Sequence, residues 1–93
     1  NPAENSKEVR FKVQILASPE KLDVTDSRIW NIPQVGCYQE NGLWKYTAGD
    51  ETTYEAANKL LSDMKRTHKD AFMIAFQGDK KISVSEARKL TKK

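Results

Sequence analysis

The sequence predicts a small α+β domain in which an antiparallel sheet packs against helices. Three features carry this prediction. Leu43–Phe76 reads as strand, helix and strand; Arg10–Ala17 alternates between apolar and polar residues; and an Asn-Gly pair joins two candidate strands. With 93 residues, of which 38% are hydrophobic, the chain suffices for one domain with a thin core. We expect that domain over residues 9–93, after a disordered polar linker at residues 1–8.

The first strand is expected at Arg10–Ala17, because its apolar residues recur with the period of two that buries one strand face. That face consists of Phe11, Val13, Ile15 and Ala17. Ser18–Pro33 has a ragged apolar pattern and predicts one or two short helical turns and a loop. Ser18 suits an N-cap, and Pro19 suits the first helical position. Trp30 is expected to plug the edge of the core.

Gln34–Glu40 and Leu43–Gly49 are expected to form an antiparallel hairpin, because Asn41-Gly42 tolerates the positive φ of a tight turn. A helix follows, with Thr52 and Glu55 at the spacing of a capping box. Its apolar residues recur at intervals of three and four, as in an amphipathic helix. They are Tyr54, Ala57, Leu60, Leu61 and Met64.

The end of the chain predicts a last strand at Ala71–Phe76 and a short helix at Ser83–Leu90, where Ser83 and Glu86 repeat the capping-box spacing. Lys80–Ile82 either extends the last strand or lies beside it. Both faces of the last strand are apolar, with Phe72, Ile74 and Phe76 on one and Ala71, Met73 and Ala75 on the other. Alternation alone therefore leaves open which face is buried.

This order of elements is the ferredoxin-like βαββαβ pattern, with a short C-terminal helix appended. Right-handed crossovers place both helices on one face of a four-stranded antiparallel sheet. The opposite face is then bare unless the C-terminal helix or a partner covers it. A bare sheet face is a platform for an extended ligand.

Charge and cysteine content restrict the function. Charged residues make up 31% of the chain but are mixed in sign, so the net charge is +3, which is not the footprint of a dedicated nucleic-acid binder. Cys37 is the only cysteine, which excludes an internal disulfide and a zinc cluster, and we expect it to be half-buried. No apolar run approaches the roughly 18 residues of a membrane span, and no segment of the sequence has the pattern of a signal peptide. The chain starts at Asn1 without methionine, so we expect a domain excised from a larger protein.

Catalysis has no support in the sequence. His68, the only histidine, is expected to be a solvated residue at a helix end rather than a base. Neither Gly-x-Ser-x-Gly nor a phosphate-binding glycine loop occurs. The carboxylates are scattered at turns and helix starts, which does not favour a glycosidase pair. We expect a protein that is not an enzyme and that uses no metal or cofactor.

A polymer-binding sheet face is the alternative. Lys12, Gln14 and Ser18 are expected on or near the polar face of the first strand. In the third strand Leu43, Lys45 and Thr47 share one face, and Trp44, Tyr46 and Ala48 share the other. Sugars suit such a surface, because apolar side chains pack on their C–H faces while amides and ammonium groups reach their hydroxyls. An ordinary solvated sheet face fits the same spacing. Phenylalanines on the face would also fit RNA stacking, although the signature of RNA-recognition domains is absent.

Four short segments together resemble a SPOR domain, of the version found at the C-terminus of cell-wall amidases and lipoproteins of Bacteroides-type bacteria. They are Val13-Gln14, Lys45-Tyr46-Thr47-Ala48-Gly49, Tyr54-Glu55-Ala56-Ala57 and Asp70-Ala71-Phe72. The resemblance covers about residues 10–76. It implies a βαββαβ fold that binds peptidoglycan, specifically glycan strands stripped of stem peptides, on the sheet face away from the helices.

By position, the resemblance implies ligand contacts from Gln14 and Ser18 on the first strand, Leu43 and Lys45 on the third, and Phe72 on the last. Leu43 stands where the family often has an aromatic residue, and the adjacent Trp44 serves instead if the register slips by one. Lys45 stands where an arginine is frequent. The resemblance also places Phe72 toward the ligand.

The sequence thus predicts a non-catalytic, monomeric module that binds peptidoglycan glycan strands. Through them it targets a parent protein, such as an N-acetylmuramoyl-L-alanine amidase, to the wall in the periplasm or cell envelope. The rival hypotheses are a protein-interaction domain that uses the sheet face or an exposed strand edge, and a domain that binds single-stranded RNA.

Overall fold

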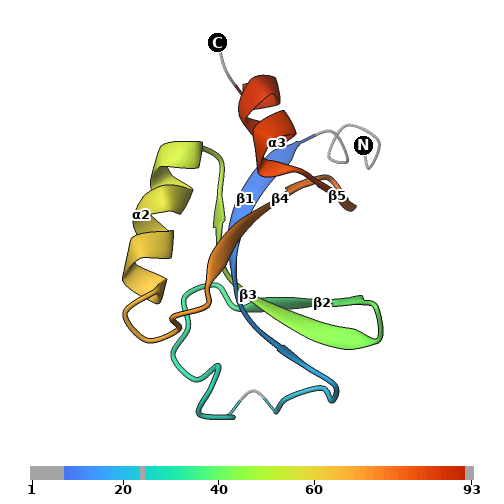
Figure 1. Cartoon of the computed structure of the whole chain (residues 1–93), viewed down its shortest axis with the longest axis vertical. Coiled ribbons are helices and arrows are strands. Elements are labelled where there is room, and N and C mark those ends of the chain that lie inside the picture. Colours follow the sequence, from blue (N-terminus) through green and yellow to red (C-terminus); the bar gives the residue numbers. More distant parts are fainter. Residues whose placement is uncertain (1–7, 24, 92–93) are drawn as a thin grey trace.

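The computed structural model describes residues 8–23 and 25–91, so of the predicted linker at 1–8 only Glu8 lies within the described residues. The described chain is an α+β domain with five strands and two helices (Figure 1). In chain order they are β1 (Val9–Ser18), β2 (Gly36–Glu40), β3 (Leu43–Glu51), α2 (Tyr54–Met64), β4 (Phe72–Gln77), β5 (Lys80–Ile82) and α3 (Val84–Thr91).

The strands form one sheet in the order β2-β3-β1-β4-β5. Every neighbouring pair is antiparallel, and β1 lies at the centre. The predicted count of four strands was wrong, because Lys80–Ile82 forms a fifth. The chain reverses at Gly78, which has a φ of +61°, and lays Ile82 opposite Ala75. This is the arrangement in which Lys80–Ile82 lies beside the last strand.

The β2–β3 hairpin was predicted correctly. Asn41 and Gly42 have φ values of +54° and +77°, the pair of positive values that a two-residue turn with the twist of a hairpin requires. The turn fixes a register in which Glu40 lies opposite Leu43 and Tyr38 lies opposite Lys45. These opposed residues share one face of the sheet.

Both helices pack on the same face of the sheet. Phe11 of β1 and Ala75 of β4 share a buried cluster with Ala57 of α2 and Ala87 of α3. A second cluster, around Val13, Ile29 and Tyr46, packs against the other end of α2. The side chains of Ala57 and Ala87 are only methyl groups, which lets α2 and α3 approach the strands closely.

Two β-bulges interrupt the pairing of β1 with β3. One lies in β3 at Gly49 and the other lies in β1 at Ile15. Because side chains alternate between faces, an extra residue in one strand reverses the alternation beyond it. The prediction that Ala17 continues the buried face of Phe11, Val13 and Ile15 was therefore wrong, and Ala17 is exposed.

The first crossover, residues 19–35, contains turns and no helix among its described residues. The backbone amides of Ile29 and Trp30 both donate to the carbonyl of Asp26. Ile29 is buried at 4% exposure, whereas Trp30 is 64% exposed. The prediction that Trp30 plugs the core was wrong, since the turn that buries Ile29 directs the next side chain outward.

The start of α2 differs from the prediction by one residue. Thr53, not Thr52, is the N-cap: its backbone is extended and its hydroxyl accepts a hydrogen bond from the amide of Ala56 at 3.2 Å. Three residues after Thr53 stands an alanine, so no reciprocal capping box forms. At α3 the Ser83 half of the predicted capping box is present, because the hydroxyl of Ser83 accepts from the amide of Glu86 at 3.0 Å.

Candidate functional site

The candidate site is the face of the sheet that no helix covers. The strand pairing gives its members, because directly opposed residues point to the same side. We call it the concave face. It is formed by Arg10, Lys12 and Gln14 of β1, Tyr38 and Glu40 of β2, Leu43, Lys45 and Thr47 of β3, Phe72, Ile74 and Phe76 of β4, and Lys81 of β5.

This face is strongly curved, as the curl of the sheet in Figure 1 shows. Between β2 and β4 lie two strands, which in a flat sheet would separate them by about 14 Å. The rings of Tyr38 and Phe76, one from each of these strands, nevertheless pack edge to face with centroids 5.4 Å apart. Side chains of one hairpin therefore meet those of the other across the face.

A hydrogen bond occupies the centre of the concave face. The Tyr38 hydroxyl donates to Oε1 of Gln14 at 2.8 Å. Gln14, Thr47 and Ile74 are 7%, 2% and 4% exposed, although no helix lies on this side. The side chains of β2 that reach across the sheet thus keep water away from these three residues.

An ion-pair network joins the two edges of the sheet. Oε1 of Glu40 accepts from Nζ of Lys45 at 2.9 Å and from Nζ of Lys81 at 3.2 Å. These two hydrogen bonds, the stronger from Lys45, lower the pKa of Glu40. Burial acts to lower the pKa of Lys81, but contacts with Tyr38 and Glu40 outweigh it and raise that pKa. The Lys81 ammonium also lies 5.5 Å from the centroid of the Tyr38 ring.

The cations of β1 are paired as well. Asp50 receives a hydrogen bond from Nη1 of Arg10 at 2.9 Å and lies 3.9 Å from Nζ of Lys12. Nζ of Lys12 lies 5.9 Å from the centroid of the Phe76 ring. Arg10 also pairs with Glu8. The four cations Arg10, Lys12, Lys45 and Lys81 thus face three carboxylates, so most of the positive charge of the concave face is paired.

Phe72 is the most exposed aromatic residue of the concave face, at 48%. It lies opposite Gln14. Ala71, Met73 and Ala75 instead pack with the clusters under the helices. The structure thus resolves the choice that alternation left open, and the phenylalanines of β4 face away from the helices.

Two of the predicted ligand residues do not lie on this face. Ser18 is opposite Trp44, and Trp44 packs against the core cluster on the helix side, with Nζ of Lys21 lying 5.3 Å from its ring centroid. The bulge at Ile15 reverses the alternation between Gln14 and Ser18, so the prediction that both lie on one polar face was wrong. Ser18 is 5% exposed, and its hydroxyl accepts from the amide of Glu20.

The concave face thus brings together Gln14, Leu43, Lys45 and Phe72 of the predicted set. Sequence reasoning missed Tyr38, Glu40 and Lys81, which with Phe76 hold the face together, and it left open whether Phe76 faces this side. The Asn-Gly turn carried a usable signal for two of them, because it fixes Tyr38 opposite Lys45 and Glu40 opposite Leu43. No sequence signal located Lys81, whose position depends on the curl of the whole sheet.

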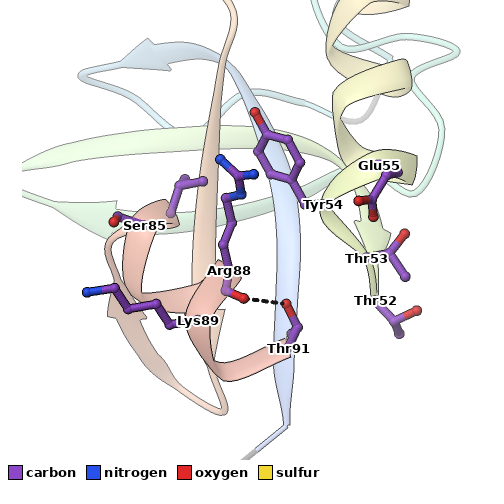
Figure 2. Close-up of a pocket in the computed structure, with 9 residues that line it drawn as sticks. Thr52, Thr53, Tyr54, Glu55, Ser85, Arg88, Lys89 and Thr91 are labelled. Atoms are coloured by element: carbon purple, nitrogen blue, oxygen red, sulfur yellow. Dashed lines mark hydrogen bonds between the residues drawn. The ribbon is translucent and has the colours of Figure 1, made fainter. Parts of the chain in front are cut away.

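A second hollow lies between the start of α2 and α3 (Figure 2). This cleft has a volume of about 600 Å³ and none of the predicted ligand residues lines it. The Arg88 guanidinium stacks on the ring of Tyr54 at 4.1 Å from its centroid. The wall is largely hydroxylic or charged, and its residues are Thr52, Thr53, Tyr54, Glu55, Val84, Ser85, Arg88, Lys89 and Thr91.

Three further observations concern reactive groups. Cys37 is exposed on the edge strand β2, so the expectation of a half-buried thiol was wrong; β2 extends past the cover of the helices. His68 links two loops, with Nε2 lying 3.1 Å from the carbonyl oxygen of Arg28. Among residues 8–23 and 25–91, no three His, Cys, Asp or Glu side chains gather as they would around a metal ion.

Within the same described residues, no helix is long and apolar enough to cross a bilayer.

Comparison with known proteins gives no match: no family model, no curated protein and no solved structure is significantly similar to this chain.

Proposed function

We propose that this chain is a non-catalytic module that binds glycan strands of peptidoglycan, those lacking stem peptides, on the concave face. In this proposal it acts as a SPOR-type domain that targets a parent cell-wall protein, such as an N-acetylmuramoyl-L-alanine amidase, within the bacterial envelope. The proposal starts from the sequence resemblance and is supported by two structural observations, the strand order and the nature of the concave face.

The strand order supports the fold that the resemblance implies. The first four strands follow the order β2-β3-β1-β4, which is that of a ferredoxin-like βαββαβ sheet. The chain departs from the pattern in its first crossover, which lacks a helix in the described residues, and in the added strand β5. Neither departure covers the concave face with a helix.

The observation that carries the proposal is a sheet face without helices that combines an exposed aromatic ring with largely paired charge. Phe72 offers a half-exposed ring on which the C–H face of a sugar can pack. Because most of the cations of this face are paired with Glu8, Glu40 and Asp50, the face suits an uncharged, hydroxyl-rich polymer better than a polyanion such as RNA. An RNA site needs cations free to replace the counterions of phosphates.

Retention of the purified domain on sacculi tests the proposal. The domain should pellet with sacculi, and more should pellet after an amidase has removed the stem peptides. Phe72→Ala should reduce retention at least several-fold. The matched control is Leu90→Ala, because Leu90 on α3 is equally exposed, 49% against 48%, but lies on the helix side of the sheet.

Two outcomes would overturn the proposal. In one, the domain stays in the supernatant with treated and untreated sacculi alike. In the other, Phe72→Ala and Leu90→Ala bind equally well, which would remove the concave face from the site. Capture of single-stranded RNA with a steep loss of affinity in salt would favour the nucleic-acid hypothesis instead.

A further inference from the structure

The concave face is closed by its own side chains in the ligand-free protein. Gln14 and Lys45 are the two polar residues of this face that the sequence predicts as ligand contacts. Oε1 of Gln14 already accepts from the Tyr38 hydroxyl at 2.8 Å, and Nζ of Lys45 already donates to Glu40 at 2.9 Å. Both of the partners that occupy them, Tyr38 and Glu40, come from the edge strand β2.

The same two β2 residues also contact the far side of the sheet. Tyr38 packs against Phe76 of β4, and Glu40 accepts from Lys81 of β5. In a flat sheet β2 and β5 would lie about 19 Å apart. The contacts therefore connect the two edges across the face, and they account for the burial of Gln14, Thr47 and Ile74 on a side without helices.

We infer that Tyr38 and Glu40 form a lid, held by Phe76 and Lys81, which competes with the ligand for the concave face. Opening moves the β2–β3 hairpin away from β4 and β5 and frees the polar atoms of Gln14 and Lys45. The identity of the ligand rests on the proposed function, whereas the closed lid rests on the contacts above.

A lid of this kind has a definite effect on affinity. A ligand that binds only the open form has an apparent Kd equal to the intrinsic Kd divided by the open fraction. Weakening the lid therefore tightens binding. Loss of the exposed Lys81–Glu40 pair is expected to raise the apparent affinity about two- to fivefold.

Lys81→Met tests the lid, with Lys80→Met as its control. Methionine keeps an unbranched apolar side chain and removes the charge. Lys80 is an exposed neighbour in β5 whose side chain points to the other face, because successive strand residues alternate. Both variants change the net charge equally, so a difference between them reports the contact with Glu40 and Tyr38.

On amidase-treated sacculi, Lys81→Met should bind about two- to fivefold more tightly than the wild type, and Lys80→Met should match the wild type. Retention of the wild type should also rise with added salt, which screens the Lys81–Glu40 pair, while Lys81→Met should lose most of this dependence. Unchanged or weaker binding of Lys81→Met overturns the lid and leaves the proposed function intact if the wild type still binds.

A measurement without ligand separates the two proposals. In the free protein, the open population that relaxation dispersion measures at the rings of Tyr38 and Phe76 should be about two- to fivefold larger in Lys81→Met than in the wild type. Lys80→Met should match the wild type. Equal open populations in all three proteins overturn the lid even if no sugar binds. Failure of the wild type to bind sacculi, with the open populations behaving as expected, refutes the glycan and keeps the lid.

Discussion

Replacement of Gly49 by alanine is expected to destabilise the domain by about 2–4 kcal/mol. Gly49 forms the bulge in β3 with a φ of +78°, a conformation that costs an L-residue about 1–2 kcal/mol. A Cβ atom at this position would also lie 2.1 Å from Cδ2 of Leu60 in α2. The leucine must move to relieve that overlap, which adds about 1–2 kcal/mol for overpacking between strand and helix.

Gly42→Ala is the matched control. Gly42 has nearly the same φ, +77°, but an added Cβ would meet no atom within 4 Å. It should therefore cost only the backbone term, about 1–2 kcal/mol. Urea titration followed by far-UV circular dichroism measures both losses, and in thermal melts each kcal/mol corresponds to about 4–8 °C. Equal losses at the two glycines would refute the steric contribution of Leu60, and no loss at either would refute the strain argument.

The other predictions use the same unfolding assays. Phe11→Ala should cost about 3–5 kcal/mol because the ring is fully buried, whereas Trp30→Ala should change stability by less than about 0.5 kcal/mol; similar losses would contradict the assigned core. Thr53→Ala should lower stability by about 1 kcal/mol, because it removes the N-cap of α2. A larger loss of stability for Thr52→Ala would show that Thr52 is the N-cap instead. Hydrogen bonds from the side chain and backbone of Arg28 lower the pKa of Asp26 from 3.8 to about 2. Because the folded pKa is the lower one, this stabilisation is present above pH 3.8 and is lost as the pH falls through about 2. The difference in melting temperature between the wild type and Asp26→Asn should shrink over that range, and a constant difference would exclude the linkage.

Local signals predicted the elements whose residues agree with one another. The Asn41-Gly42 turn gave the hairpin, and the apolar stripe of α2 gave the helix that packs on the sheet. The cap at Ser83 gave α3. In each case the residues that determine the structure are neighbours in the sequence, so a short pattern contains the information.

The rest depends on contacts between distant residues. Period-two alternation placed Gln14 and Ser18 together, and it failed because the pairing of β1 with β3 adds a residue at Ile15. The curl of the sheet brings Tyr38 and Lys81 over the concave face, although no local sequence pattern around either residue predicts that curl. Trp30 illustrates a third limit, since a one-residue change in a turn decides which of two adjacent apolar side chains is buried.

Titration of the isotopically labelled domain with purified, peptide-free glycan strands most directly tests whether sugar binds where we propose. Two-dimensional NMR spectra should show the largest changes at Phe72, Gln14 and their neighbours in β1 and β4, with little change in α3. Changes concentrated around Tyr54 and Arg88, or a spectrum that the glycan leaves unaltered, would contradict the account.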